Sequence, residues 1–197
     1  MSDPWTIAQF PAQYQALLQA TAAINFSMAS EPLTGTLLQA LATSRPQGQF
    51  LEIGTGTGLS TAWLLAGMDS ESQLVSLEND PQALAIAQQT LATDARVSLV
   101  LTDAAQWLEQ AVKAGRSFDL IFADTWAGKF THLDQALALL KPGGLYVIDD
   151  LLPQANWPEG HGEKVAALIE DLERRSELAI AKLQWASGLL IASRRAS

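Results

Sequence analysis

The sequence contains no cysteine, and its 12 lysine and arginine residues are outnumbered by 21 aspartate and glutamate residues. Without cysteine, the chain has no disulfide bond, no thiolate metal ligand and no cysteine nucleophile. The net charge is −9, whereas a protein that binds nucleic acid needs clustered basic residues to neutralise phosphates. Adjacent basic residues occur only at Arg174-Arg175 and Arg194-Arg195. We therefore expect no nucleic-acid partner.

Long apolar runs are also missing from the 197 residues. None approaches the ~18–20 consecutive apolar residues of a membrane span, and residues 1–5 lack the basic segment and apolar core of a secretory signal. With 48% hydrophobic and 17% charged residues, the composition is typical of a globular domain. We expect one cytoplasmic domain over residues 1–197, with no membrane partner.

The chain does contain a glycine-rich stretch that follows a short apolar segment. Residues 50–60 read F-L-E-I-G-T-G-T-G-L-S, which predicts a buried strand, a tight turn and a helix over 60–66. Glycine has no Cβ, so it allows a sharp turn and a close approach of a ligand to the backbone. This order is typical of a nucleotide site at the carboxyl edge of a parallel sheet. The spacing differs from the G-x-G-x-x-G of dinucleotide-binding proteins, and an ordinary turn between strand and helix is the alternative.

Apolar strands alternate with helices along the chain. Beyond the first strand, at 50–53, strands are expected at 74–78, 96–101, 118–124 and 145–150. Further helices are expected near 80–91, from 103 onward, at 130–140 and at 163–176. Such units predict a parallel α/β sheet with right-handed crossovers. Two last apolar runs, 178–185 and 189–193, predict a hairpin that closes the sheet.

Residues 1–45 are expected to form a helical cap beside the core at 46–197. A first helix, 5–24, would place these apolar residues on one face: Phe10, Tyr14, Leu17, Leu18 and Ile24. That face covers either the sheet or a partner subunit, which leaves a homodimer open. Ser30 is expected to cap a second helix at about 33–43, with Pro32 in its first turn.

The run from Glu52 to Gly58 matches E/D-x-G-x-G-x-G and resembles the first motif of class I S-adenosylmethionine-dependent methyltransferases. Together with the pattern from Met28 to Gly35, Asp124 after F-D-L-I-F-A, and the run P-G-G-L-Y-V-I-D-D, the chain over 28–151 resembles catechol and caffeoyl-CoA type O-methyltransferases. The resemblance implies a doubly wound, seven-stranded, mostly parallel Rossmann-like sheet with an antiparallel last strand. It also implies S-adenosylmethionine as cofactor and a small, hydroxylated, catechol-like acceptor.

Glu78 ends the second strand, roughly twenty residues beyond the glycine turn, where doubly wound folds place a carboxylate on ribose hydroxyls. Asp103 opens a helix that holds the adenine in the family, although an aspartate there is equally suited to capping the helix. The residues expected to bind the cofactor are Met28, Glu52, Gly54, Thr55, Gly56, Ser60, Glu78, Asn79, Asp103, Ala104, Asp124 and Trp126.

Three aspartates follow strand ends on the expected ligand side: Asp124, Asp149 and Asp150. Converging carboxylates repel one another unless a cation lies between them, and Mg²⁺ prefers such oxygen ligands. The resemblance implies that these three hold a divalent metal, while capping or solvent exposure is the alternative for each. The chain departs from the family because Lys129 follows Asp124 by five positions, and because the pair is Asp-Asp rather than Asp-Asn.

The expected catalytic residues are Asp124, Lys129 and His161. An acceptor hydroxyl must lose its proton to a base. The resemblance assigns that role to a lysine, and His161, in the loop after the aspartate pair, is a second candidate. Trp126 and Trp157 are expected to sandwich a planar acceptor, unless they only pack within their loops.

The sequence therefore predicts an S-adenosylmethionine-dependent O-methyltransferase that acts on a small molecule with the help of a divalent cation. Three alternatives remain open. They are a metal-independent N- or O-methyltransferase, a dinucleotide-dependent oxidoreductase, and a regulatory protein that binds the cofactor without turnover.

Overall fold

The computed structural model of the chain describes residues 6–155 and 157–196. Residues 1–5 lie outside this part. They include the first residue of the first expected helix and the segment that is expected to lack a secretory signal. The elements are α1 (Tyr14–Ala23), α2 (Pro32–Thr43), β1 (Gln49–Ile53), α3 (Leu59–Gly67), β2 (Gln73–Glu78), α4 (Pro81–Leu91), β3 (Val97–Leu101), α5 (Ala104–Lys113), β4 (Phe118–Ala123), α6 (Leu133–Ala138), β5 (Leu140–Ile148), α7 (His161–Arg174), β6 (Leu178–Leu183) and β7 (Leu189–Arg194).

Seven strands form one sheet in the order β3-β2-β1-β4-β5-β7-β6. Strands β1 to β5 pair in parallel, whereas β7 runs antiparallel to both β5 and β6. The strand order reverses between β1 and β4, and α/β sheets bind ligands at the carboxyl ends of strands beside such a reversal. The expected doubly wound sheet with an antiparallel C-terminal hairpin is confirmed.

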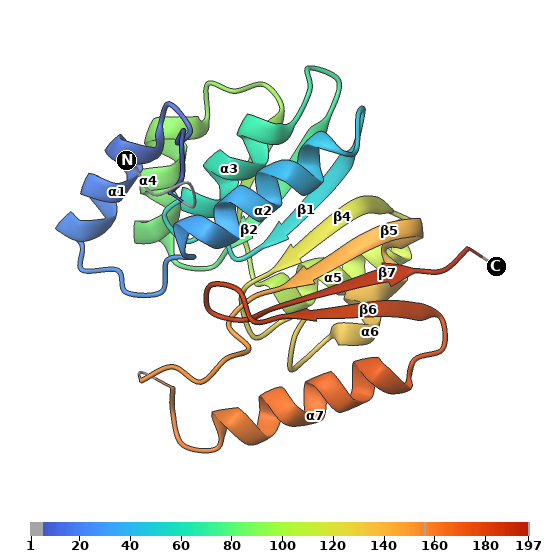
Figure 1. Ribbon diagram of the computed structural model, residues 1–197. Helices are drawn as coiled ribbons and strands as arrows, with labels where there is room; N and C mark the ends of the chain where they lie inside the picture. The colour runs from blue at the N-terminus through green and yellow to red at the C-terminus, as the bar shows by residue number, and fades with distance from the viewer. Residues whose placement is uncertain (1–5, 156, 197) are drawn as a thin grey trace.

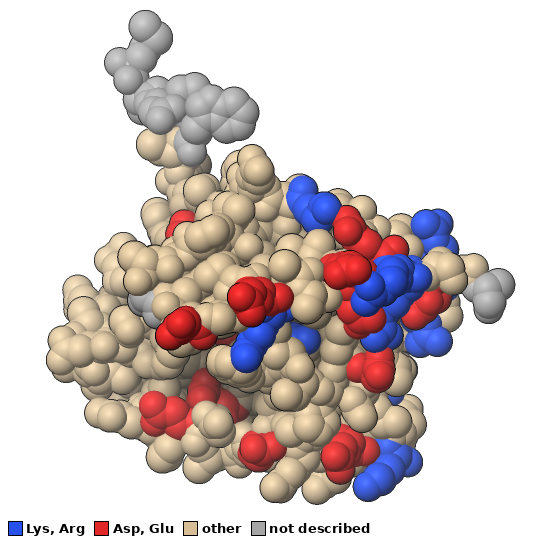
Figure 2. Space-filling view, turned by 90° about the horizontal axis from the view of Figure 1, so that it is seen from below, with Lys and Arg blue, Asp and Glu red and all other residues tan. Residues whose placement is uncertain are grey.

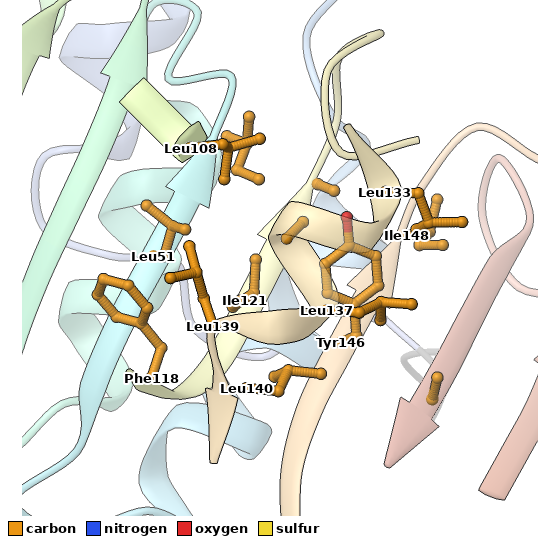
Figure 3. Close-up of a cluster of buried hydrophobic side chains, with 14 of the residues drawn as sticks. Leu51, Leu108, Phe118, Ile121, Leu133, Leu137, Leu139, Leu140, Tyr146 and Ile148 are labelled. Carbon is orange, nitrogen blue, oxygen red and sulfur yellow. The ribbon is translucent and has the colours of Figure 1, made fainter. Parts of the chain in front are cut away.

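Helices cover both faces of this sheet (Figure 1), with α7 running along the face opposite α2 and α3. On one face, α1 to α4 enclose an apolar cluster that includes Leu17, Leu38 and Trp63. On the other face, α5, α6 and α7 enclose a second cluster, part of which is drawn in Figure 3 around Tyr146. Burial of these side chains, at roughly 25 cal/mol per Å², stabilises the layers and holds the strand ends in place.

Helix α1 begins later than expected, at Tyr14. Pro11 precedes it, and a proline inside a helix removes a hydrogen bond and clashes with the preceding turn. Tyr14 and Leu17 are buried as expected, but Phe10 and Leu18 are 38% and 43% exposed. Helix α1 packs on α3 and α4, so what it covers is helical rather than the sheet itself.

The segment Lys141-Pro142-Gly143-Gly144 lies inside β5 and not in a turn before it. Pairing with β4 shifts register between Phe118–Leu140 and Leu120–Leu145, which is the signature of a bulge. Strand β5 therefore starts earlier than expected, and α6 is correspondingly short.

Charges of both signs are intermingled on the face shown in Figure 2, and acidic side chains also lie in a hollow of that face. Among the described helices, none combines the length and the hydropathy that a bilayer-spanning helix needs.

Candidate active site

A cavity of about 450 Å³ lies at the carboxyl ends of β1, β2 and β4, a size typical of small-molecule sites. It brings together most of the expected cofactor-binding residues: Met28, Gly54, Thr55, Gly56, Ser60, Glu78, Asn79, Ala104, Asp124 and Trp126. Lys129 and His161 also line it, so all three expected catalytic residues do. The other expected residues lie outside its lining: Glu52, Asp103, Asp149, Asp150 and Trp157.

The glycine turn forms one wall of the cavity. Gly56 has φ +52°, a conformation that side chains rarely adopt, and a Cβ there would lie 3.3 Å from the Phe26 ring. Thr57, in the same turn, shares a 2.6 Å hydrogen bond with Thr21 of α1. Leu59 and Ser60 line the cavity at the start of α3, where backbone N–H groups and the helix dipole favour negative charge. The hydrogen bond with α1 thus stabilises the conformation of the turn.

Glu78 holds its carboxylate against the glycine turn. Its Oε2 accepts a hydrogen bond from the Gly56 backbone N–H at 2.7 Å, and its Oε1 accepts from Asn79 and Asp80 at 2.9 and 3.0 Å. Because β2 ends at this residue, the carboxylate lies at the rim of the sheet and lines the cavity. The carboxylate that was expected to bind ribose thus lies in the cavity lining, beside the glycine turn.

Glu52 was expected among the cofactor-binding residues, and its position does not suit that role. Its side chain is fully buried and accepts hydrogen bonds from the hydroxyls of Thr61 on α3 and Ser76 on β2. Burial raises the pKa of Glu52 to about 7, although these hydroxyls oppose the shift. Ser76 in turn pairs with Thr55 at 2.5 Å. Glu52 therefore ties the helix and two strands beneath the turn.

Asp103 takes the capping role. Its carboxylate accepts from the Gln106 backbone N–H at 2.9 Å and so caps α5. Its neighbours Thr102 and Ala104 line the cavity, whereas Asp103 itself is exposed. The start of α5 remains a wall of the cavity, formed by these smaller residues.

Asp124 lies at the end of β4 in contact with two other segments. Ser30 donates its hydroxyl to Asp124 Oδ2 at 2.9 Å, and Lys129 Nζ lies 3.8 Å from Oδ1. Burial raises the pKa of Asp124, and Lys129 and Ser30 oppose that rise. Ser30 was expected to cap α2, but Glu31 occupies the N-cap position. The hydroxyl instead fixes the carboxylate at the cavity wall.

Asp149 and Asp150 do not join Asp124 in a metal site. The Asp149 carboxylate accepts from the Ser187 hydroxyl and from the Asp150 backbone N–H, and burial together with the charge of Asp124 raises its pKa to about 7. Asp150 adopts a left-handed conformation, and its carboxylate accepts from the Trp157 indole N–H at 3.0 Å. Among the described residues, no three Asp, Glu, His or Cys side chains are grouped to hold a metal.

The cation in this region is Lys129. Its side chain is 4% exposed, and Nζ donates to the Asp149 backbone oxygen at 2.8 Å while it faces Asp124. A metal bound between the aspartates would meet this ammonium, so the side chains present do not fit the expected divalent site. In this arrangement the Lys129 ammonium and four hydrogen-bond donors, namely the hydroxyls of Ser30 and Ser187, the Asp150 backbone N–H and the Trp157 indole N–H, already contact the three carboxylates.

His161 lies in the first turn of α7, surrounded by aromatic rings. Ring centroids of Trp157, Phe130 and Trp126 lie 4.5, 5.1 and 5.9 Å from its own. Its exposed fraction is 6%, and neither ring nitrogen has a hydrogen-bond partner among the described residues. His132, the second histidine, lies elsewhere, with Nε2 3.5 Å from Glu109.

Sequence reasoning missed several residues of the cavity. Phe26, Ala29, Ser30, Thr102, Thr125 and Phe130 also line it. Phe26 and Ser30 belong to the segment between α1 and α2, and Phe130 to the segment between β4 and α6. Neither segment has the regular periodicity that identifies buried positions, so only their proximity to the strand ends could have suggested them.

The comparisons with known proteins agree with this geometry. A family model described as "Methyltransferase domain" matches residues 51–151. The catechol O-methyltransferase of Niastella koreensis is 34% identical over 126 residues, which cover 61% of this chain and 57% of that protein. A putative O-methyltransferase of Mycolicibacterium vanbaalenii is 32% identical over 125 residues, 61% of this chain and 54% of that one. The match thus spans little more than half the length of these relatives.

Solved structures share the whole fold. A putative O-methyltransferase from Klebsiella pneumoniae superposes with a TM-score of 0.82 at 26% identity, covering 96% of this chain and 93% of that one. The O-methyltransferase from Bacillus cereus, solved with SAH, gives a TM-score of 0.84 at 23% identity, covering 96% and 94%. With a family model that matches about half of its length, this chain belongs to the methyltransferase domain family.

Proposed function

We propose that this chain transfers a methyl group from S-adenosylmethionine to a hydroxyl oxygen of a small, planar molecule. The observation that carries the proposal is the Glu78 carboxylate, held beside the glycine turn in a cavity of about 450 Å³. The names of the relatives support it, because one is a catechol O-methyltransferase and one solved structure contains SAH.

The cofactor would be held by the ends of three strands. Glu78 would accept hydrogen bonds from ribose hydroxyls, and Thr102 and Ala104 would border the base. The start of α3 presents backbone N–H groups that suit a carboxylate. When bound, S-adenosylmethionine supplies a methyl group on a positively charged sulfur, which an acceptor oxygen attacks.

The acceptor would occupy the aromatic end of the cavity. Trp126 is 51% exposed and borders the cavity with Phe130 and His161. Flat aromatic walls suit a planar ring, and holding two reactants in line supplies a large part of the acceleration, about 7–11 kcal/mol in well-oriented systems. A divalent cation has no part in this proposal, because Lys129 Nζ lies beside Asp124 and Asp149, and the described residues include no group of three acidic or histidine side chains placed to hold a metal.

Two measurements test the proposal. Calorimetry should show S-adenosylhomocysteine binding with a Kd below about 0.1 mM, whereas NADH should not compete. Incubation with S-adenosylmethionine and either phenol or catechol should then yield the methyl ether, detected by mass spectrometry. Absence of S-adenosylhomocysteine binding would contradict the cofactor, and binding without any methylated product would favour a regulatory role.

A further inference from the structure

We propose that His161 is the catalytic base that takes the proton from the acceptor hydroxyl, in a reaction without a divalent cation. The inference rests on the methyl transfer proposed above, and it names both the proton acceptor and the substrate class. That class is planar molecules in which one hydroxyl suffices, because the described residues of the site do not require a second oxygen for chelation.

The His161 ring is buried without a polar partner among the described residues. It is 6% exposed, it lines the cavity, and both nitrogens lack a hydrogen-bond partner among the described residues. A buried polar group without a hydrogen-bond partner is destabilising, so native structures keep few of them. A hydroxyl that reached a ring nitrogen would supply the missing partner, and because both nitrogens are themselves buried, the aromatic rings around them must shift to admit it.

The other ionisable side chains that line the cavity already have hydrogen-bond or ion-pair partners within the protein. Glu78 and Asp80 accept from backbone N–H groups at the opposite end. Asp124 accepts from Ser30 and faces Lys129. Lys129 donates to the Asp149 carbonyl, so it serves as a fixed cation. His161 is the ionisable group of this lining without a partner among the described residues.

Aromatic rings and charged groups surround the His161 imidazole. Trp126, Phe130 and Trp157 surround it, and because Trp126 and Phe130 also line the cavity, a planar ring that enters would lie beside these two rings. Charged groups lie near these rings on three segments. On α7, Lys164 lies over the Trp126 ring at 5.5 Å, and Lys129 and Asp124 follow β4. After β5, the Asp150 carboxylate accepts from the Trp157 indole N–H. Lys129 can stabilise negative charge that develops on the acceptor oxygen.

The step balances without any further reactant. The bond between the acceptor oxygen and the methyl carbon forms as the bond between sulfur and that carbon breaks, and sulfur keeps the electron pair. The hydroxyl proton passes to a ring nitrogen of His161, giving an imidazolium that later releases the proton to solvent. Histidine suits this exchange because it changes charge near neutral pH.

The test compares two histidine variants, with phenol and catechol as acceptors. His161→Gln should lower kcat about 10²- to 10⁴-fold, the usual contribution of a general base, and should leave the Kd for S-adenosylhomocysteine within threefold. His132→Gln is the matched control and should leave the rate unchanged. A kcat for His161→Gln within threefold of wild type would overturn the proposal.

A second measurement uses the unmodified protein, in case the variant fails to fold. In ¹⁵N spectra of the imidazoles with saturating S-adenosylhomocysteine, added phenol should shift His161 and leave His132 unchanged. Turnover should also survive EDTA, and phenol should be methylated as readily as catechol. Loss of activity in EDTA with recovery in Mg²⁺, or an unshifted His161, would refute the inference. Failure to bind S-adenosylhomocysteine would instead refute the proposed function.

Discussion

Replacing Glu78 tests the cofactor end of the site most directly. Its carboxylate accepts three backbone N–H groups, at 2.7, 2.9 and 3.0 Å. Asn79 and Asp80 are exposed, so water can replace two of these bonds in Glu78→Ala. The remaining loss is the charged hydrogen bond to the ribose, about 2–3 kcal/mol with its unsatisfied partners. The Kd for S-adenosylhomocysteine should therefore rise about 30- to 150-fold.

Calorimetry measures this change in Kd. Two further variants serve as a control and as an intermediate case. Glu71→Ala removes the same charge from the exposed loop before β2, so it should leave the Kd within a factor of two of wild type. Glu78→Gln keeps one carbonyl acceptor and should give an intermediate loss. If Glu78→Ala binds S-adenosylhomocysteine as tightly as wild type while its circular dichroism is unchanged, the assignment of Glu78 is wrong.

Three further predictions concern the turn, the buried acid and the surface. Gly56→Val should abolish S-adenosylhomocysteine binding, because a β-branched residue at φ +52° is strained and its Cβ meets Phe26. The control, Gly115→Val, has a similar φ of +66° with open space around it, and should bind S-adenosylhomocysteine normally in the same calorimetric assay. The pKa of Glu52 is raised from 4.5 to about 7, so its contribution to stability is complete below pH ~4.5 and is lost as the pH rises through ~7. Urea unfolding should show Glu52→Gln gaining on wild type between pH 5 and 8, by on the order of 3 kcal/mol; equal pH slopes would contradict this. Asp149 also has a raised pKa, about 7, so the free energy of unfolding of Glu52→Gln should still fall as the pH rises through this range. With a net charge of −9 and mixed charges on the face in Figure 2, the protein should not retain tRNA in filter binding at ~0.15 M salt, and salt-sensitive retention at micromolar concentration would overturn the small-molecule acceptor.

Much of the fold could be predicted because it depends on local pattern. The apolar segments at 50–53, 74–78 and 118–123 alternate with helices, and they form β1, β2 and β4 as expected. The glycine run and the acid at the end of β2 also lie where strand order and spacing place them, because parallel strands bring their carboxyl ends to one edge. Departures such as the late start of α1 follow from single residues, here Pro11.

The tertiary structure decided which of the chemically suitable residues serve the site. Glu52 precedes the glycine turn, yet its side chain is buried and accepts hydrogen bonds from Thr61 on α3 and Ser76 on β2. Asp149 and Asp150 follow a strand end, yet Ser187 and Trp157 bind their carboxylates. These hydrogen-bond partners come from other parts of the chain, and no local sequence pattern predicts them.

Ser30 and Lys129 show the same division between what the sequence determined and what packing decided. The sequence placed a serine before a helix and a lysine after a strand, and both had reasonable local roles. In the folded chain, Ser30 reaches across 94 positions to Asp124, and Lys129 reaches the carbonyl of Asp149. Local sequence determines backbone geometry, whereas the charge balance of a buried site depends on which side chains the layers bring within hydrogen-bonding distance.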